Sequence, residues 1–257
     1  MDTDTTETFS AKASASISPV IEIEQLKKSF EDNEVLKGIN LILNKGENLV
    51  VLGKSGTGKS VLIKSIVRLI WPEAEKLNVL GQDVLSLSKE EMNKLRVKMG
   101  FLFQGGALYD SMTVKENLEF PLRRSLSSKG DVTTLIEEAL ENVGLLEAIN
   151  KMPSELSGGM RKRISLARTL ILKPEIMLYD EPTTGLDTIT SGEISELILE
   201  MQKKYKISSI IITHDMPCAK ITSNRIMVLM DGINIAEGTY KELENSTEKN
   251  IRDFFKQ

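Results

Sequence analysis

The chain has 257 residues, a hydrophobic content of 40% and a formal net charge of −4. These values suit a soluble globular protein with one large domain or two small ones, and they provide no general attraction to nucleic acid. The single cysteine, Cys218, excludes an internal disulfide and fits a reducing compartment. Charged residues interrupt every long apolar run, and the N-terminus lacks the basic start and apolar centre of a secretory signal. We therefore expect a cytoplasmic protein without a membrane span.

The first part of the chain predicts β-structure that follows a disordered tail. Residues 1–19 are rich in Ser, Thr, Asp and Ala and have little to bury, so we expect them to be disordered. Strands are predicted at 20–23, 35–43, 48–52 and 97–103, and a hairpin is predicted over 77–84. We expect an antiparallel β layer laid beside a parallel core.

The middle of the chain, from about 105 to 172, has the periodicity of helices. Leu135, Ala139 and Val143 share one helical face, and Gly144 is a plausible helix stop. A later helix is indicated by apolar residues at helical spacing, including Ile164 and Ala167. We therefore expect a helical insertion between two groups of strands.

The last part returns to strands that alternate with helices. The apolar run at 176–179 and the run at 207–213 are typical of parallel strands covered on both faces, and a helix is predicted around 194–201 between them. Asp231 and Gly232 lie between two apolar runs and predict a hairpin. Alternating strands and helices indicate an α/β fold. The tail at 247–257 has apolar residues at helical spacing, which could pack on a neighbouring subunit or on its own domain.

One loop predicts a nucleotide site. It follows the predicted strand at 48–52, precedes a predicted helix at 61–70, and matches the pattern G-x-x-x-x-G-K-[S/T]. We call it the phosphate loop, and it consists of Gly53, Lys54, Ser55, Gly56, Thr57, Gly58, Lys59 and Ser60, with Val61 beginning the helix. Backbone N–H groups and a helix N-terminus converge on a polyphosphate in such a loop. We expect Lys59 to reach the β- and γ-phosphates and the Ser60 hydroxyl to ligate Mg²⁺.

An acidic pair follows the predicted strand at 176–179. Asp180 and Glu181 would emerge at the carboxyl end of a parallel strand, where open α/β sheets bind their ligands. We expect Asp180 to hold the Mg²⁺ shell and Glu181 to orient and deprotonate the attacking water. Taken alone, the pair would favour a solvated acidic turn, and the phosphate loop argues against that alternative.

Two further motifs have a structural and a functional interpretation. Ser157, Gly158, Gly159 and Met160 precede a helix, and this sequence suits either an ordinary capped helix start or an anion site. The following charges, residues 161–163, are typical of a solvated helix face. His214, the single histidine, follows a predicted strand and could be structural or could face the phosphates.

The set of motifs, in this order and spacing, resembles the ATP-binding subunits of ABC transporters. The set is made up of the phosphate loop, Gln104, residues 156–160, 176–181 and 184–187, and His214, and the resemblance covers about 20–237. It implies an α/β P-loop NTPase with a RecA-like parallel-sheet core, an antiparallel β subdomain and an inserted α-helical subdomain at about 105–172. The ATP-binding domain would span 20–240, with a C-terminal extension at 241–257.

The resemblance also implies a composite site. Two copies would close head-to-tail over two ATP molecules, and each ATP would lie between the phosphate loop of one copy and the signature of the other, which consists of Ser157, Gly158, Gly159 and Met160. Asp187 would communicate across this interface. Glu181, His214 and Gln104 would form the catalytic set.

The remaining roles concern the metal ion, the γ-phosphate, adenine and the membrane partner. Ser60, Gln104 and Asp180 would hold Mg²⁺, His214 would contact the γ-phosphate, and Gln104 would couple the Mg²⁺ site to a permease. Phe30 takes the place of the aromatic residue that stacks on adenine, and the alternative is an ordinary core residue at the end of a strand. The family's usual signature ends in Gln, and Met160 replaces it here.

Local matches are similar to the Mla-type subfamily, which serves permeases working with MCE-domain lipid-binding proteins. The matches lie at 103–112, 120–123 and 152–160. They imply an ATPase on the cytoplasmic side of a bacterial inner membrane that drives phospholipid transport, with a separate permease, an MCE-type protein, a small regulatory subunit and no nucleic acid as partner. Two alternatives stay open: a different cargo such as an amino acid, a metal complex or a drug, and a non-transport ABC ATPase acting on ribosomes or DNA.

Overall fold

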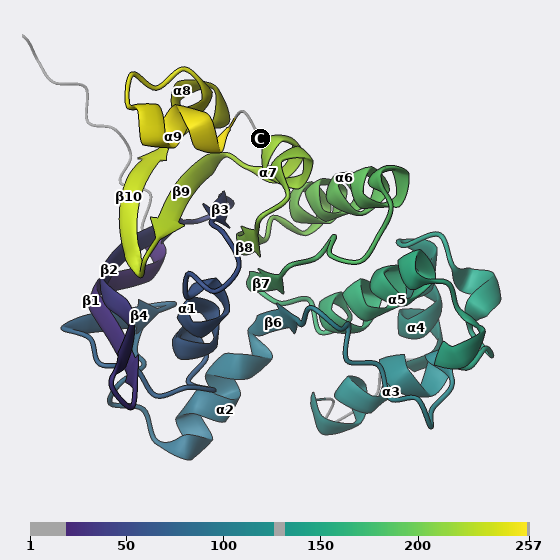
Figure 1. Cartoon of the computed structure of the whole chain (residues 1–257). Coiled ribbons are helices and arrows are strands. Elements are labelled where there is room, and N and C mark those ends of the chain that lie inside the picture. The colour runs from purple at the N-terminus through teal and green to yellow at the C-terminus, as the bar shows by residue number, and fades with distance from the viewer. Residues whose placement is uncertain (1–18, 126–131, 256–257) are drawn as a thin grey trace, which may run out of the picture.

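The computed structural model describes residues 19–125 and 132–255, which form two β-sheets with helices between and beside them (Figure 1). The larger sheet has the strand order β10-β9-β3-β8-β7-β6. Its strands are β3 (Asn48–Leu52), β6 (Met99–Leu102), β7 (Ile176–Asp180), β8 (Ser208–Thr213), β9 (Arg225–Met230) and β10 (Ile233–Gly238). Neighbouring strands from β9 to β6 pair in parallel, and β10 runs antiparallel to β9.

The parallel strands are buried on both faces, which explains their continuous apolar sequences. In β3, Leu49 and Val51 point into one hydrophobic core, and Val50 and Leu52 point into another. This alternation is the two-residue period of a strand. Each fully buried aliphatic side chain of this kind contributes about 1.5–3 kcal/mol, so the central strands are a rigid base for the loops at their ends.

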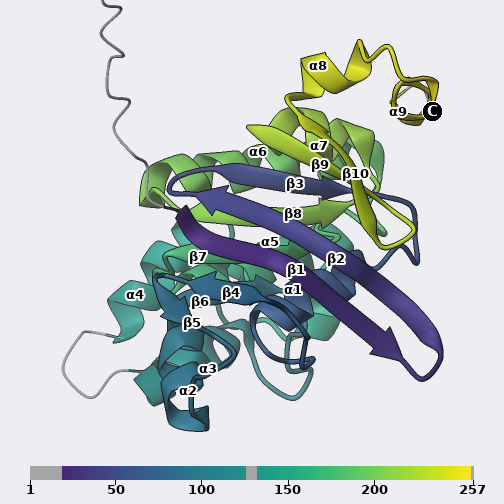
Figure 2. The ribbon, with the colours of Figure 1, turned by 90° about the vertical axis from the view of Figure 1, so that its left-hand side faces the viewer.

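The smaller sheet is antiparallel and has the order β2-β1-β4-β5 (Figure 2). It is formed by β1 (Pro19–Phe30), β2 (Asn33–Asn44), β4 (Lys76–Val79) and β5 (Gln82–Asp83). Helix α1 (Lys59–Ile66) shares a hydrophobic core with both sheets through Leu62, Ile63 and Ile66. The helix after the phosphate loop is therefore fixed between two sheets.

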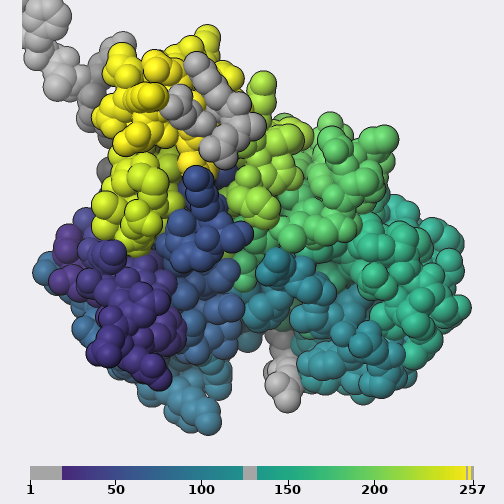
Figure 3. Space-filling model, viewed as in Figure 1, coloured from purple at the N-terminus to yellow at the C-terminus, as the bar shows by residue number. Residues whose placement is uncertain are grey.

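A lobe of helices is inserted between β6 and β7. It contains α3 (Val114–Ser125), α4 (Val132–Glu141), α5 (Gly158–Leu170) and the short 3-10 helices η1 (Leu146–Ala148) and η2 (Pro153–Glu155). Figure 3 shows this lobe, in teal, on the side of the molecule opposite β1 and β2. The α5 residues Ile164 and Ala167 pack in the same core as Ile194 and Ile198 of α6 (Thr188–Tyr205).

The C-terminal helices pack on their own domain. After α7 (Met216–Thr222) and the β9–β10 hairpin come α8 (Tyr240–Glu244) and α9 (Lys249–Phe254). Ile251 and Phe255 are buried, and the ring of Phe255 meets that of Tyr240 edge-on with 5.3 Å between centroids. Of the two expectations for this tail, the structure supports packing on its own domain.

The predicted fold class is confirmed, with the antiparallel sheet, parallel core and helical insertion in the expected order. Several boundaries differ. Val97 belongs to α2 (Lys89–Val97), a helix that was not predicted although Ser88 and Glu91 form a capping box at its start. The strand predicted at 97–103 is shorter and ends at Leu102, so Gln104 lies in the turn beyond it.

Two other boundaries were also wrong. The helix predicted at 61–70 begins at Lys59 and ends at Ile66, because Arg68 takes a left-handed φ of 50°. Pro19, which we expected in the tail, already belongs to β1, and the rest of the predicted tail lies outside the described residues. Within 19–125 and 132–255, no helix is both long and apolar enough to cross a bilayer.

Candidate nucleotide-binding site

The phosphate loop joins the carboxyl end of β3 to the N-terminus of α1. Gly58 caps this helix with a φ of 98°, and a Cβ at this position would lie 2.8 Å from Leu36 Cδ2 and 3.1 Å from the Val35 carbonyl oxygen. Both the backbone conformation and the space therefore require glycine. The cap makes no side-chain hydrogen bond. Since the first N–H groups of a helix have no partner within it, this terminus is suited to bind an anion.

Lys59 is buried and lies inside the loop. Its Nζ donates to the carbonyl oxygens of Gly53, at 2.7 Å, and Lys54, at 3.0 Å. The same ammonium lies 3.3 Å from Glu181 Oε1. Lys59 thus connects the phosphate loop to the turn that follows β7.

Both the backbone and the side chain of Glu181 are held by contacts within the site. Its φ of 50° is unusual for a residue with a side chain and costs on the order of 1–3 kcal/mol. The backbone N–H donates to the Ile212 carbonyl oxygen at 3.0 Å, which holds the turn on β8. The carboxylate is contacted by His214 Nδ1 at 2.9 Å and accepts a hydrogen bond from Thr184 Oγ1 at 3.2 Å. Strain of this kind clusters at functional sites.

Asp180 lies at the end of β7, next to the first turn of α1. Ser60 Oγ donates to Asp180 Oδ1 at 2.9 Å. Burial raises the pKa of Asp180, and the Ser60 hydrogen bond and the charges of Lys64 and Lys59 oppose this rise in part. A hydroxyl and a carboxylate at this distance are hard oxygen donors of the type that Mg²⁺ takes together with substrate phosphates.

Predicted residues that follow β3, β6, β7 and β8, together with Val35 of β2, line one depression at the carboxyl edge of the parallel sheet. This lining comprises Val35, Ser55, Gly56, Gly58, Lys59, Ser60, Val61, Gln104, Glu181 and His214. Lys54 and Thr57 line the adjoining groove beside the β9–β10 turn. Phe30 lies at the exposed end of β1, with Lys28 Nζ 5.3 Å from its ring centroid.

The signature residues line a different groove. Ser157, Gly158, Gly159 and Met160 lie there together with residues 185–187 and Thr190. Ser157 caps α5, since its Oγ accepts from the Met160 N–H at 3.2 Å. Asp187 caps α6 and accepts from the N–H groups of Ile189 and Thr190 at 3.1 and 3.0 Å. Two helix N-termini therefore open onto one groove that is separate from the phosphate loop.

Lys162 contradicts the expectation of a solvated charged face at 161–163. It is 7% exposed, and its ammonium donates to the carbonyl oxygens of Gln104 and, at 3.4 Å, of Glu181. Its neighbour Arg161 is exposed as expected, and Arg163 forms an ion pair with Glu193 at 2.6 Å. The sequence offered no way to distinguish Lys162, because burial at this position depends on how α5 docks beside the ends of β6 and β7.

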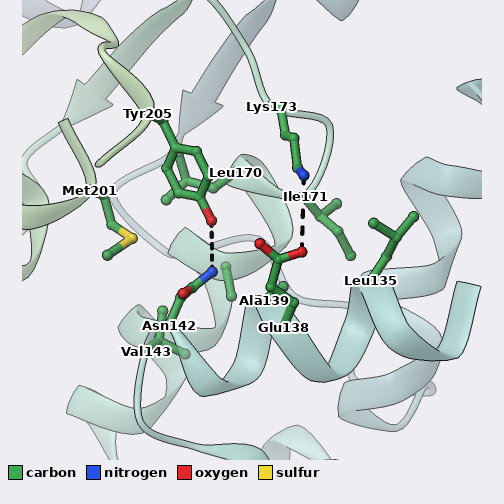
Figure 4. A pocket seen from close by; sticks show the side chains of 11 residues that line it. Leu135, Glu138, Ala139, Asn142, Val143, Leu170, Ile171, Lys173, Met201 and Tyr205 are labelled. Atoms are coloured by element: carbon green, nitrogen blue, oxygen red, sulfur yellow. Dashed lines mark hydrogen bonds and ion pairs between the residues drawn. The ribbon is translucent and has the colours of Figure 1, made fainter. Parts of the chain in front are cut away.

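A further cavity lies between α4, α5 and α6, away from the phosphate loop (Figure 4). Its walls are largely apolar, with Leu135, Leu170 and Met201 among them. Its edges are joined by a hydrogen bond from Asn142 to Tyr205 Oη at 2.7 Å and by an ion pair between Lys173 and Glu138 at 3.9 Å. It lacks the loop and helix terminus that suit a phosphate, so the depression at the phosphate loop is the candidate nucleotide site.

The fold and the site together define a P-loop nucleotide-binding cassette. The family model described as "ABC transporter" matches residues 36–184. This match covers more than half of the sequence, and the chain belongs to the ABC transporter family as an ATP-binding, ATP-hydrolysing subunit.

Several curated proteins are similar over most of the chain. The "Intermembrane phospholipid transport system ATP-binding protein MlaF" of Haemophilus influenzae is 35% identical, over 92% of this chain and 90% of its own length. The "Probable ribonucleotide transport ATP-binding protein mkl" of Mycobacterium leprae is 37% identical, over 91% and 68%, so this chain spans about two thirds of that relative. The chloroplastic protein TRIGALACTOSYLDIACYLGLYCEROL 3 of Arabidopsis thaliana is 37% identical, over 91% and 73%.

Solved structures support the same assignment. The chain is similar to cbiO1 of Clostridium perfringens, described as part of the ABC transporter complex cbiONQ, with a TM-score of 0.81, 29% identity and coverage of 87% and 90%. It is also similar to the ATP-binding cassette MJ0796 in a dimeric post-hydrolysis state bound to ADP and Pi, with a TM-score of 0.78, 29% identity and coverage of 85% and 98%.

The raised pKa of Asp180 predicts a specific pH dependence of stability. A carboxyl whose pKa is higher in the folded state stabilises the fold fully below its unfolded pKa, and this stabilisation is lost as the pH rises through the folded pKa. We expect Asp180→Asn to raise the melting temperature of the nucleotide-free protein near neutral pH. The gain should shrink as the pH falls toward the ordinary pKa of an aspartate side chain in the unfolded chain. Thermal denaturation across pH measures both effects.

Asp187→Asn is the matched control with the opposite sign. Hydrogen bonds from Thr190 lower the pKa of Asp187, so its stabilisation is present above the unfolded pKa and is lost as the pH falls. Asp187→Asn should therefore lower the melting temperature near neutral pH. Equal shifts of the melting temperature in the same direction for the two variants would contradict a pKa of Asp180 raised by burial.

Proposed function

We propose that this chain energises phospholipid transport between two membranes by hydrolysing ATP beside a separate permease. The supporting observation for the cargo is the similarity to MlaF, which extends over nearly the whole of both chains. A different cargo is the second candidate, because "Methionine import ATP-binding protein MetN" of Lacticaseibacillus paracasei is 36% identical, over 84% of this chain and 62% of its own length.

The chain's own residues provide the parts for hydrolysis. The phosphate loop and the start of α1 bind the phosphates through backbone N–H groups, and Lys59 neutralises the β- and γ-phosphates. Glu181 is the general base that orients and deprotonates the attacking water. His214, 2.9 Å from the Glu181 carboxylate, positions that base and faces the γ-phosphate. Phe30 provides the aromatic surface for adenine at the exposed end of β1.

Ser60, Asp180 and Gln104 are the residues that would hold Mg²⁺. The 2.9 Å contact between Ser60 and Asp180 already places two oxygen donors together, and Gln104 lines the same depression. When bound there, Mg²⁺ neutralises charge on the β- and γ-phosphate oxygens. Its double charge also favours the ionised form of Asp180, whose pKa burial raises.

The complete site requires a second copy of the chain. The signature residues lie in a groove separate from the phosphate loop, and each groove has a helix N-terminus suited to an anion. In a head-to-tail dimer, the Ser157–Gly159 end of one copy faces the γ-phosphate held by the other. Asp187 borders the signature groove and provides the contact between the two sites.

The permease binds, in this proposal, at the helical segment that follows Gln104. Residues 104–122 include Tyr109, which is 41% exposed and whose ring lies 4.9 Å from that of Phe120. A cytoplasmic helix of the permease would dock on this aromatic pair. The ATPase would then lie on the cytoplasmic side of the inner membrane, and an MCE-type lipid-binding protein and a small regulatory subunit complete the proposed assembly.

We expect Glu181→Gln to bind ATP normally and to lose roughly 10²–10⁴-fold in turnover, the usual contribution of a general base. The variant keeps the size of the side chain and removes its basicity. Steady-state hydrolysis and binding of a fluorescent ATP analogue measure the two effects separately. Glu175→Gln is the matched control, because Glu175 is an exposed residue just before the other end of β7. Near-normal turnover by Glu181→Gln would exclude Glu181 as the general base.

A photo-cross-linker at Tyr109 should link this chain to a multispanning permease in the purified complex. The same cross-linker at Ile233 on β10, an exposed position of similar accessibility, should not. Mass spectrometry of the linked band identifies the partner. If residues 104–122 never cross-link to the permease, the docking surface is wrong. If the co-purified complex contains an amino-acid permease, the phospholipid cargo is wrong.

A further inference from the structure

One face of α5 holds the backbone of the segment that follows Gln104. The Lys162 ammonium donates to the Gln104 carbonyl oxygen. One turn later, Ser165 lies so close to Gly106 that a Cβ there would be 2.6 Å from Ser165 Oγ. Arg168 then donates to the Ala107 carbonyl oxygen at 2.7 Å. The three α5 residues are spaced by three, which places them along one side of the helix.

This face also reaches the proposed permease surface. The Arg168 guanidinium lies 5.1 Å from the ring centroid of Tyr109 and donates to Asn117 Oδ1 at 3.3 Å. Asn117 in turn accepts from the Tyr109 N–H at 2.8 Å. Tyr109 is therefore joined to α5 by direct contacts.

Besides Gln104, Lys162 contacts the turn that contains Glu181. Its ammonium donates to the Glu181 carbonyl oxygen at 3.4 Å, and the same oxygen accepts from the Thr184 N–H at 3.3 Å. The turn has the strained φ of 50° at Glu181, so it depends on such contacts to keep the carboxylate in place. Lys162, on the signature helix, therefore contacts both the chain at Gln104 and the backbone of the turn that carries the base.

Burying the Lys162 ammonium costs free energy unless polar or oppositely charged groups surround it. Burial lowers the pKa of Lys162, and the carboxylates of Asp180 and Glu181 favour its charged form. A buried ammonium is tolerated when carbonyl oxygens and carboxylates surround it. An apolar side chain of the same length could fill the space, but it could not hold the two carbonyl oxygens.

We infer that Lys162 is a positioning residue that ties the Glu181 turn and the chain at Gln104 to the signature helix α5. Permease binding at residues 104–122 is thereby linked to the placement of both the base of one site and the signature that serves the other. This inference rests on the proposed function, because it assigns a task within the same hydrolysis reaction and the same docking surface.

The test compares Lys162→Met, Lys162→Arg and Arg161→Met in the complex co-purified with the permease. We expect Lys162→Met to lower kcat by about 10- to 100-fold, the usual effect of misplacing a catalytic group by about 1 Å. The KM for ATP should stay within about twofold, since the phosphate loop is intact. The stimulation of hydrolysis by the permease, relative to the isolated subunit, should disappear.

Lys162→Arg keeps a positive donor and should restore both kcat and the stimulation to within about threefold of the unaltered protein. Arg161→Met changes an exposed neighbour on the same helix and should leave both unchanged. If Lys162→Met does not fold, Lys162→Gln takes its place, since it keeps a neutral donor and should lose the stimulation while retaining ATP binding.

The outcomes separate this inference from the proposed function. If the unaltered complex hydrolyses ATP and Lys162→Met behaves like Arg161→Met, the positioning role is wrong and the proposed function stands. The role is equally wrong if Lys162→Met raises the KM and leaves kcat and the stimulation intact. If the unaltered complex does not hydrolyse ATP, the proposed function and the positioning role both fail.

Discussion

The contact on which the site depends is the ion pair between Lys59 and Glu181, 3.3 Å apart and buried. It joins the loop after β3 to the turn after β7, with β8 between these strands in the sheet. Parallel pairing places all three strand ends at one edge, which is where open α/β sheets bind ligands. The tight hydrophobic packing of the central strands keeps this edge rigid. A strained backbone at Glu181 can persist only because its surroundings are fixed in this way.

The helical lobe also holds parts of the site in place through contacts made by α5. α5 begins at the signature groove and continues along the turn of Glu181 and the segment after Gln104. The cavity between α4, α5 and α6 shows that this junction is bridged by single contacts, such as that between Asn142 and Tyr205, as well as by packed side chains (Figure 4). The lobe thus contacts the rest of the domain both at this cavity and at the Glu181 turn.

Local patterns predicted most of the fold and most of the residues that line the candidate site. The phosphate loop and the β7 strand were recognisable because each needs fixed residue types at fixed spacings, as glycine at Gly58 illustrates. The helix α2 was missed because its interior is mostly charged, although its capping box was visible in the sequence. Lys162 could not be predicted, since its burial results from packing between elements far apart in the chain. The contact between Glu181 and His214 likewise joins residues whose proximity only the sheet order determines.

The central claim is that each ATP site is shared by two copies, and a mixed dimer tests it most directly. Lys59→Met removes the phosphate-loop lysine, and Ser157→Arg blocks the signature groove, so each variant alone should be inactive. A purified dimer with one copy of each retains one intact pairing, between the phosphate loop of the second variant and the signature of the first. The account predicts that this mixed dimer regains ATP hydrolysis well above both parent dimers. Hydrolysis no higher than that of the parents would contradict a shared site.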